Sequence, residues 1–168
     1  MSGEEELATA ADAGRLTALI NRAYEVESFF KVGPRTDEQE VRQLLADHQF
    51  LVIRDGGTIA GCVLVELRDV DGYFGMLSVD PAHQGAGVGA RLVAEAEHFC
   101  SERGRRTMSL VVVNLREELP PWYAKLGYSV SGTEPWPEYA RDRVSRPCHF
   151  IVMTKAIGVR TPALEPRR

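Results

Sequence analysis

The residues with the clearest chemical pattern lie between a strand-like segment and a helix-like segment in the middle of the chain. Gly85, Gly87 and Gly89 stand at alternate positions, after a β-branched run that ends at Val79 and at the start of an amphipathic pattern. A backbone without Cβ atoms lets several N–H groups converge on a bound anion, and the positive end of a helix dipole adds to the attraction. The segment therefore predicts a cradle for a pyrophosphate, rather than a glycine-rich turn without a ligand.

Two other phosphate-binding patterns fit this segment less well. Residues 85–90 satisfy the dinucleotide fingerprint G-x-G-x-x-G/A, but five residues separate them from the end of the strand. The next strand ends at Asn114, whereas a dinucleotide site needs an acidic residue there to hold a ribose. A nucleotide P-loop needs Gly-Lys-Ser/Thr, which the chain lacks. A nicotinamide-dependent oxidoreductase is therefore disfavoured.

The elements that position this loop follow from hydrophobic periodicity. The order is one strand, two helices, three strands, a helix, a strand, a helix and two closing strands, which indicates an α+β domain with a mixed sheet. Thr36-Asp-Glu-Gln39 has the form of a capping box, and Asp55-Gly56-Gly57 is a strong hairpin signal. The predicted strands are 7–10, 50–53, 59–67, 73–79, 108–113 (buried on both faces), 128–131 and 149–154, and the predicted helices are 12–24, a segment from 36, 87–103 and 122–126.

Length and composition limit the classes of function. The 168 residues suffice for one domain, predicted over 1–157, with a flexible Pro- and Arg-rich tail over 158–168. A net charge of −4 gives no reason to expect a nucleic-acid partner, and no apolar run approaches the ~20 residues that cross a membrane. The acidic N-terminus does not resemble a signal or transit peptide. The three cysteines are Cys62, Cys100 and Cys148. They are too widely spaced for a zinc site, and their odd number argues against a disulfide framework, so we expect no metal and a reducing cytoplasm.

Two motifs together resemble those of a known family. Gln84-Gly-Ala-Gly-Val-Gly89 matches the Q/R-x-x-G-x-G/A signature of the GNAT superfamily of acyl-CoA-dependent N-acetyltransferases, and Leu77-Ser-Val-Asp-Pro81 resembles its usual lead-in. Downstream, Trp122-Tyr-Ala-Lys-Leu-Gly-Tyr128 looks like the family's FYxKxGF segment. The likeness runs from about residue 5 to 157. The sequence departs from the family at Pro120-Pro121 and in the long connection 133–147.

The resemblance implies a fold and a co-substrate. We expect a mixed, mostly antiparallel sheet of six to seven strands, flanked by about four helices, with a splayed strand pair in the middle. Acetyl-CoA would lie in that gap and give its acetyl group directly to a primary amine, and a homodimer is possible because dimers are frequent in the family. The cofactor-binding residues implied are Leu77, Ser78, Val79, Gln84, Gly85, Ala86, Gly87, Val88, Gly89, Ala90 and Asn114.

The resemblance also implies catalytic residues. Tyr123 aligns with the tyrosine that protonates the departing thiolate, a task suited to a phenol because it is protonated at neutral pH. The alternative is that Tyr123 only packs against Trp122 and Tyr128. Glu66, near the end of its strand, is a candidate general base for the amine, and an ordinary solvated strand residue is the alternative.

The acceptor is expected on the side of the first two helices and the late loop. Tyr24, Glu27, Phe30 and Trp136 are the predicted substrate-binding residues, since aromatic rings with a carboxylate suit a cationic, partly apolar amine. These residues do not indicate whether the acceptor is a polyamine, an amino acid, an aminoglycoside or a peptide. A non-catalytic acyl-CoA-binding sensor on the same fold is the alternative function.

Overall fold

One sheet organises the molecule. The structure, a computed structural model, describes residues 4–158, so the predicted tail beyond residue 158 lies outside the described residues. Within that range, seven strands run in the order β1-β2-β3-β4-β5-β7-β6, and every neighbouring pair is antiparallel except β4 and β5. The predicted α+β class with a mixed, mostly antiparallel sheet is confirmed. The strands are β1 (Glu4–Leu7), β2 (Gln49–Asp55), β3 (Thr58–Leu67), β4 (Asp71–Val79), β5 (Thr107–Val113), β6 (Ser129–Pro135) and β7 (His149–Ala156).

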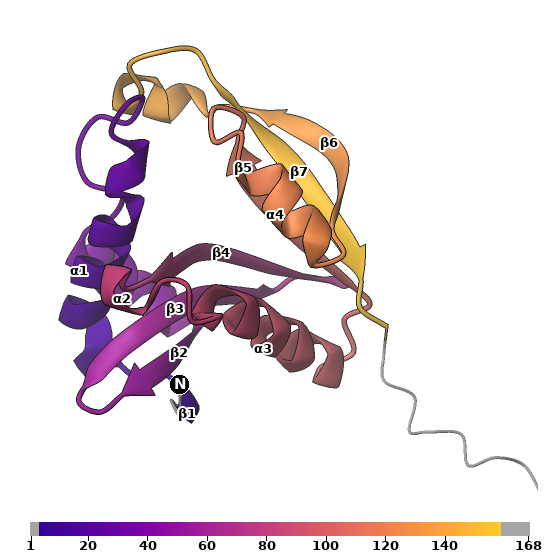
Figure 1. Ribbon diagram of the computed structural model, residues 1–168. Helices are drawn as coiled ribbons and strands as arrows, with labels where there is room; N and C mark the ends of the chain where they lie inside the picture. The colour runs from indigo at the N-terminus through magenta and orange to yellow at the C-terminus, as the bar shows by residue number, and fades with distance from the viewer. Residues whose placement is uncertain (1–3, 159–168) are drawn as a thin grey trace, which may run out of the picture.

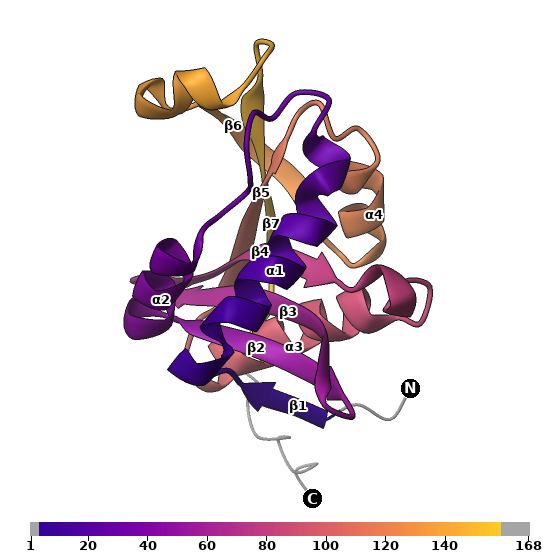
Figure 2. The same ribbon diagram turned by 90° about the vertical axis from the view of Figure 1, so that its left-hand side faces the viewer.

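Helices cover the two faces of the sheet unequally. Figure 2 shows α1 lying across β2 to β4 with α2 beside it, and α3 on the opposite face. None of the helices between residues 4 and 158 is both long and apolar enough to cross a membrane. The α-helices are α1 (Ala13–Ala23), α2 (Glu38–Asp47), α3 (Val88–Glu102) and α4 (Leu119–Lys125), and the 3-10 segments are η1 (Ala10–Asp12), η2 (Tyr24–Glu27), η3 (Pro81–His83) and η4 (Glu138–Arg143).

Two apolar clusters form the core. The first lies between α1, α2 and strands β2 to β4, with Leu16, Ile20 and Phe50 fully buried. The second lies under α3 and continues onto β5, β7 and α4, where Leu92 and Met108 are fully buried. The α1 face of β5, β7 and β6 therefore takes no part in the first cluster.

The parallel pair in the centre of the sheet is short. β4 and β5 pair only where Asp71–Tyr73 lies beside Thr107–Ser109, although both strands continue well beyond this point. Further along, β4 stays paired with β3 and β5 stays paired with β7, so the sheet opens into a V (Figure 1). The predicted splayed strand pair is present.

A bulge bends β4 at the mouth of this V. Met76 and Leu77 together face Val63, between the paired positions Cys62–Ser78 and Leu64–Gly75. Met76 has φ of 50°, a strained conformation for a residue with a side chain. The Ser78 hydroxyl donates to the Met76 carbonyl at 3.0 Å. A bulge of this kind turns backbone groups out of the ladder and towards the gap.

The local predictions need several corrections. α2 is capped by Asp37, whose carboxylate accepts from the Glu40 N–H, while Thr36 bonds Glu40 with its hydroxyl and starts no helix. α4 begins at Leu119, because Pro120 falls in a first turn, where its missing N–H costs little. β5 is not buried on both faces: Val111 is only partly buried because it faces the gap. Strand β1 also starts and ends three residues earlier than predicted.

Candidate active site

A cavity of about 810 Å³ lies in the V between β4 and β5. This volume is within the range of small-molecule and cofactor sites. Its walls come from the β4 bulge, from β5, from the loop before α3, and from α4. Its far end is formed by η2, the segment after it, and η4.

The glycine loop forms one end of the cavity. Gly85 and Gly87 have φ of 86° and 78°, which favours glycine, and a Cβ at either position would meet no atom within 4 Å. The space around the loop is thus open to a ligand. Gly87 is the N-cap residue of α3, whose first turn carries no acidic residue, so its N–H groups present an uncompensated positive end. His83 ties this loop to the β2–β3 hairpin, because its Nε2 lies 2.8 Å from Asp55 Oδ2.

The structure brings most of the predicted cofactor residues to the cavity, but not all. Ser78 is buried and supports the bulge, and Ala86 does not line the cavity. Asn114 extends the β5–β7 ladder instead: its N–H donates to the His149 carbonyl at 2.9 Å, and its side-chain oxygen accepts from the His149 N–H at 2.8 Å. The predicted residues that line the cavity are Leu77, Val79, Gln84, Gly85, Gly87, Val88, Gly89 and Ala90.

Tyr123 lies on α4 and lines the cavity. Its ring packs against Phe74, Trp122 and Tyr128, with centroid distances of 5.9, 4.9 and 6.1 Å. Its hydroxyl makes no hydrogen bond to any residue that the structure describes, whereas the Tyr128 hydroxyl donates to Glu97 at 2.8 Å. Burial raises the pKa of Tyr123, so the phenol keeps its proton at neutral pH. Tyr123 is therefore both packed and available as a proton donor.

Two of the other predicted residues lie away from the cavity. Glu66 is on the outer part of β3, where its carboxylate lies 3.4 Å from Arg68 Nη2 and 3.9 Å from His48 Nε2, and it does not line the cavity. Phe30 is fully buried and packs edge-on against Phe29 at 4.8 Å, so it has no surface for a ligand. Tyr24, Glu27 and Trp136 do line the cavity.

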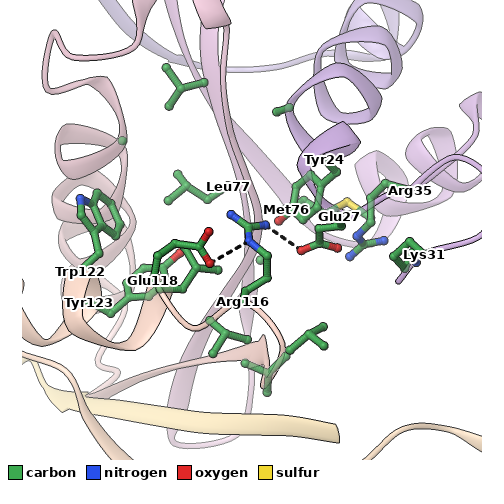
Figure 3. Close-up of a pocket in the computed structure, with 18 of the residues that line it drawn as sticks. Tyr24, Glu27, Lys31, Arg35, Met76, Leu77, Arg116, Glu118, Trp122 and Tyr123 are labelled. Atoms are coloured by element: carbon green, nitrogen blue, oxygen red, sulfur yellow. Dashed lines mark hydrogen bonds and ion pairs between the residues drawn. The ribbon is translucent and has the colours of Figure 1, made fainter. Parts of the chain in front are cut away.

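An ion pair that periodicity could not reveal crosses the middle of the site (Figure 3). Arg116, in the loop after β5, donates from Nη1 to Glu27 Oε2 at 2.8 Å and from Nε to Glu118 Oε1 at 3.3 Å. The side chains of Arg116 and Glu27 are 13% and 7% exposed, so the pair is largely shielded from water. Its partners are 89 residues apart in sequence, so no local pattern links them.

The far end of the cavity combines aromatic rings and charges. Burial raises the pKa of Tyr24 to about 12, partly offset by Arg35, whose guanidinium lies 5.3 Å from the Tyr24 ring centroid. Trp136 stacks on Phe150 at 5.1 Å and donates its indole N–H to the Ala140 carbonyl. No cluster of metal-ligating side chains occurs within residues 4–158.

Comparison with known proteins identifies the family. The chain belongs to the GNAT acetyltransferases: the model of the acetyltransferase (GNAT) family matches residues 16–128. It is therefore an acyltransferase of the GNAT type. Comparison with curated protein sequences gives no match.

Solved structures share the fold at low sequence identity. The ribosomal-protein-S18-alanine N-acetyltransferase from Escherichia coli is 16% identical, with a TM-score of 0.74 over 96% of this chain and 98% of that one. A ribosomal-protein-alanine N-acetyltransferase from Brucella melitensis is 20% identical, with a TM-score of 0.72 over 91% and 99% of the two chains. A nourseothricin acetyltransferase is 19% identical, with a TM-score of 0.72 over 94% and 99%. These likenesses concern the fold alone.

Proposed function

We propose that this protein transfers an acetyl group from acetyl-CoA directly to a primary amine of a small molecule or peptide. One observation carries the proposal beyond family membership. The strained β4 bulge, the open glycine loop and the unpaired Tyr123 hydroxyl all border the same cavity. Together they supply hydrogen-bond donors, an anion cradle and a proton source around a space of cofactor size.

Acetyl-CoA fits this cavity in chemistry and in size. Residues 84–90 would hold its diphosphate against the N-terminus of α3, where the glycines leave room for a ligand. When bound, acetyl-CoA supplies an activated acetyl thioester. Main-chain N–H groups of the Met76–Leu77 bulge would polarise the thioester carbonyl, and one well-placed donor of this kind is worth about 3 kcal/mol.

Tyr123 would protonate the departing sulfur. Its pKa is raised by burial, and its hydroxyl has no competing partner among the described residues. The same ring contacts that bury Tyr123 also fix its orientation. Positioned proton donors of this type typically contribute about 100-fold or more to the rate.

The acceptor amine would enter from the side of Tyr24, Glu27 and Trp136. An alkylammonium has a pKa of ~10 and must lose a proton before it attacks. Because Glu66 lies outside the cavity, we propose Glu27 and Glu118 as the carboxylates that receive the ammonium. The three cysteines are free thiols, which supports a reducing, cytoplasmic setting.

The test compares Tyr123→Phe with Tyr128→Phe, two phenols in the same aromatic cluster. We expect Tyr123→Phe to lower kcat at least about tenfold with little change in acetyl-CoA affinity, because only the proton donor is lost. Tyr128→Phe loses the hydrogen bond to Glu97, so it should cost about 1 kcal/mol of stability but keep its turnover. Release of free thiol across an amine library measures turnover, and calorimetry measures acetyl-CoA binding.

Two results would overturn the proposal. Equal turnover in the two variants would remove Tyr123 from the chemistry. Acetyl-CoA binding without turnover of any amine would indicate a sensor instead of an enzyme.

A further inference from the structure

The far end of the cavity carries three cationic side chains that have no carboxylate partner. Lys31, Arg35 and Arg143 line this end, and none of them forms an ion pair with any residue in the range 4–158. Lys31 and Arg35 are partly buried beside aromatic rings, with the Lys31 ammonium 5.5 Å from the Trp136 ring centroid and the Arg35 guanidinium 5.3 Å from that of Tyr24, while Arg143 is exposed. Cations in a partly enclosed space gain from an anion, because they have lost part of their hydration.

The carboxylates around the cavity do not supply that anion. Arg116 holds both Glu27 and Glu118, as described above. Glu40 accepts a hydrogen bond from the Thr36 hydroxyl. The cavity is therefore lined by four cations, Lys31, Arg35, Arg116 and Arg143, and by three carboxylates, Glu27, Glu40 and Glu118. This local excess of positive charge occurs in a chain whose net charge is −4.

Two of the three cations act on the third. The pKa of Lys31 is lowered, first by burial and then by the positive charges of Arg35 and Arg143, and Glu27 and Glu40 only oppose these effects. Like charges held together in this way repel, and a bound anion would relieve the repulsion.

Backbone pairing places Lys31 and Arg143 on two facing segments. Lys31 and Val144 form an antiparallel bridge, the Val32 N–H donates to the Arg143 carbonyl at 2.9 Å, and the Ser145 N–H donates to the Phe30 carbonyl at 2.8 Å. The arrangement joins the segment after η2 to the end of η4 across the top of the V (Figure 1). The backbone positions of Lys31 and Arg143 are thus fixed relative to each other before any ligand binds.

The cations lie apart from the glycine loop. In Figure 3, Lys31 and Arg35 lie on one side of the Arg116–Glu27 pair, and Trp122 lies on the other. Trp122 adjoins the loop, since a Cβ on Gly89 would lie 3.4 Å from its ring. The cations therefore belong to the acceptor side and not to the diphosphate cradle.

We propose that the acceptor amine carries an anionic group, a carboxylate or a phosphate, which Lys31, Arg35 and Arg143 bind. This inference rests on the proposed function and narrows its substrate class. Guanidinium groups bind carboxylate and phosphate through two parallel hydrogen bonds, which gives orientation as well as affinity. The anion would hold the substrate so that its amine points towards Glu27 and the bulge.

The experiment uses pairs of amines that differ only in the anion. Phenylalanine with phenethylamine tests a carboxylate, and phosphoethanolamine with ethanolamine tests a phosphate. In at least one pair, the anionic member should have a kcat/KM about tenfold higher or more, the value of one charge-assisted bond. Arg143→Gln should bring that ratio close to one. Arg141→Gln, in the same segment but 79% exposed and outside the cavity, should leave it unchanged.

Binding provides a second readout that does not depend on turnover. With CoA present, N-acetylphenylalanine should quench tryptophan fluorescence at concentrations about tenfold lower than N-acetylphenethylamine, because Lys31 adjoins Trp136. Calorimetry with acetyl-CoA tests the proposed function separately. If acetyl-CoA binds and amines are acetylated, but both members of each pair behave alike, the inference fails and the proposed function stands. It also fails if no anionic compound is acetylated or bound.

Discussion

The two halves of the sheet are built differently. Strands β2 to β4 have apolar cores on both faces, one under α1 and α2 and one under α3. Strands β5 and β7 contribute only to the core under α3, and every residue of β6 is exposed. The short pairing between β4 and β5 joins a half with two cores to a half with one.

This difference explains where the cavity lies. A strand face that is not committed to the core can line a site, and Val111 on β5 does so. The half with two cores supplies the rigid groups opposite: the bulge at Met76, the glycine loop and the start of α3. Preorganised donors on a rigid half, with an open face across from them, suit binding of an extended cofactor.

The largest effect is expected where the two halves are tied together. Arg116→Met leaves Glu27 buried without a partner, and we expect a loss of about 3 kcal/mol in the free energy of unfolding. Arg141→Met, which removes an ion pair with both side chains 79% exposed, should cost close to nothing. Urea unfolding measures both variants. Equal losses would mean that the Arg116–Glu27 pair does not join the halves.

The second prediction compares the loss of stability when a glycine in each half of the sheet is replaced by alanine. A Cβ on Gly61 in β3 would lie 2.7 Å from a Val88 methyl group and 3.0 Å from the Ser78 carbonyl oxygen, so Gly61→Ala should cost about 2 kcal/mol through overpacking. Gly132 in β6 has nothing within 4 Å of the same position, and Gly132→Ala should be nearly neutral. Urea midpoints of the two variants report the difference. A neutral Gly61→Ala would show that the half with two cores packs more loosely than described.

The smallest effect is a loss of stability at alkaline pH that comes from the half with two cores. Burial raises the pKa of the Cys62 thiol from 9.0 to about 12 and that of Tyr24 from 10.0 to about 12. The unfolded chain therefore releases these protons first, so stability is complete below about pH 9 and falls as the pH rises towards 12. At pH 10, one unit above the unfolded value, the part due to Cys62 should be about 1.4 kcal/mol.

The control for this prediction is the thiol on the other half. Cys62→Ala should flatten the loss between pH 8 and pH 10.5, measured by urea unfolding at both values. Cys148→Ala should change it much less, because burial raises the pKa of this partly exposed thiol less than that of Cys62. The same slope in the wild type and in Cys62→Ala would contradict the assignment.

Local chemistry made the sheet and the loop predictable from sequence. β-branched runs, the Asp55-Gly56-Gly57 hairpin and the glycines before α3 each act over a few residues, and the structure contains the elements that they predicted. The start of α2 was misplaced by two residues, because Thr36 and Asp37 are both good caps and only the fold determines that Thr36 faces Glu40.

Long-range contacts were the part that sequence could not supply. Strand alternation does not reveal that Glu66 lies outside the V, or that Asn114 completes the ladder to β7. The Arg116–Glu27 pair depends on how far β5 diverges from β4, which no local motif specifies. A glycine-rich loop is specified by neighbouring residues, whereas the far end of the cavity, where we propose that the acceptor binds, is assembled from distant segments.

The most direct measurement is amide hydrogen exchange with and without acetyl-CoA. If the cofactor lies between β4 and β5, exchange should slow at residues 76–79 and 84–90 and stay unchanged throughout β6. Protection that is absent from both segments, or that appears mainly on β6, would contradict a cofactor site in the open V of the sheet.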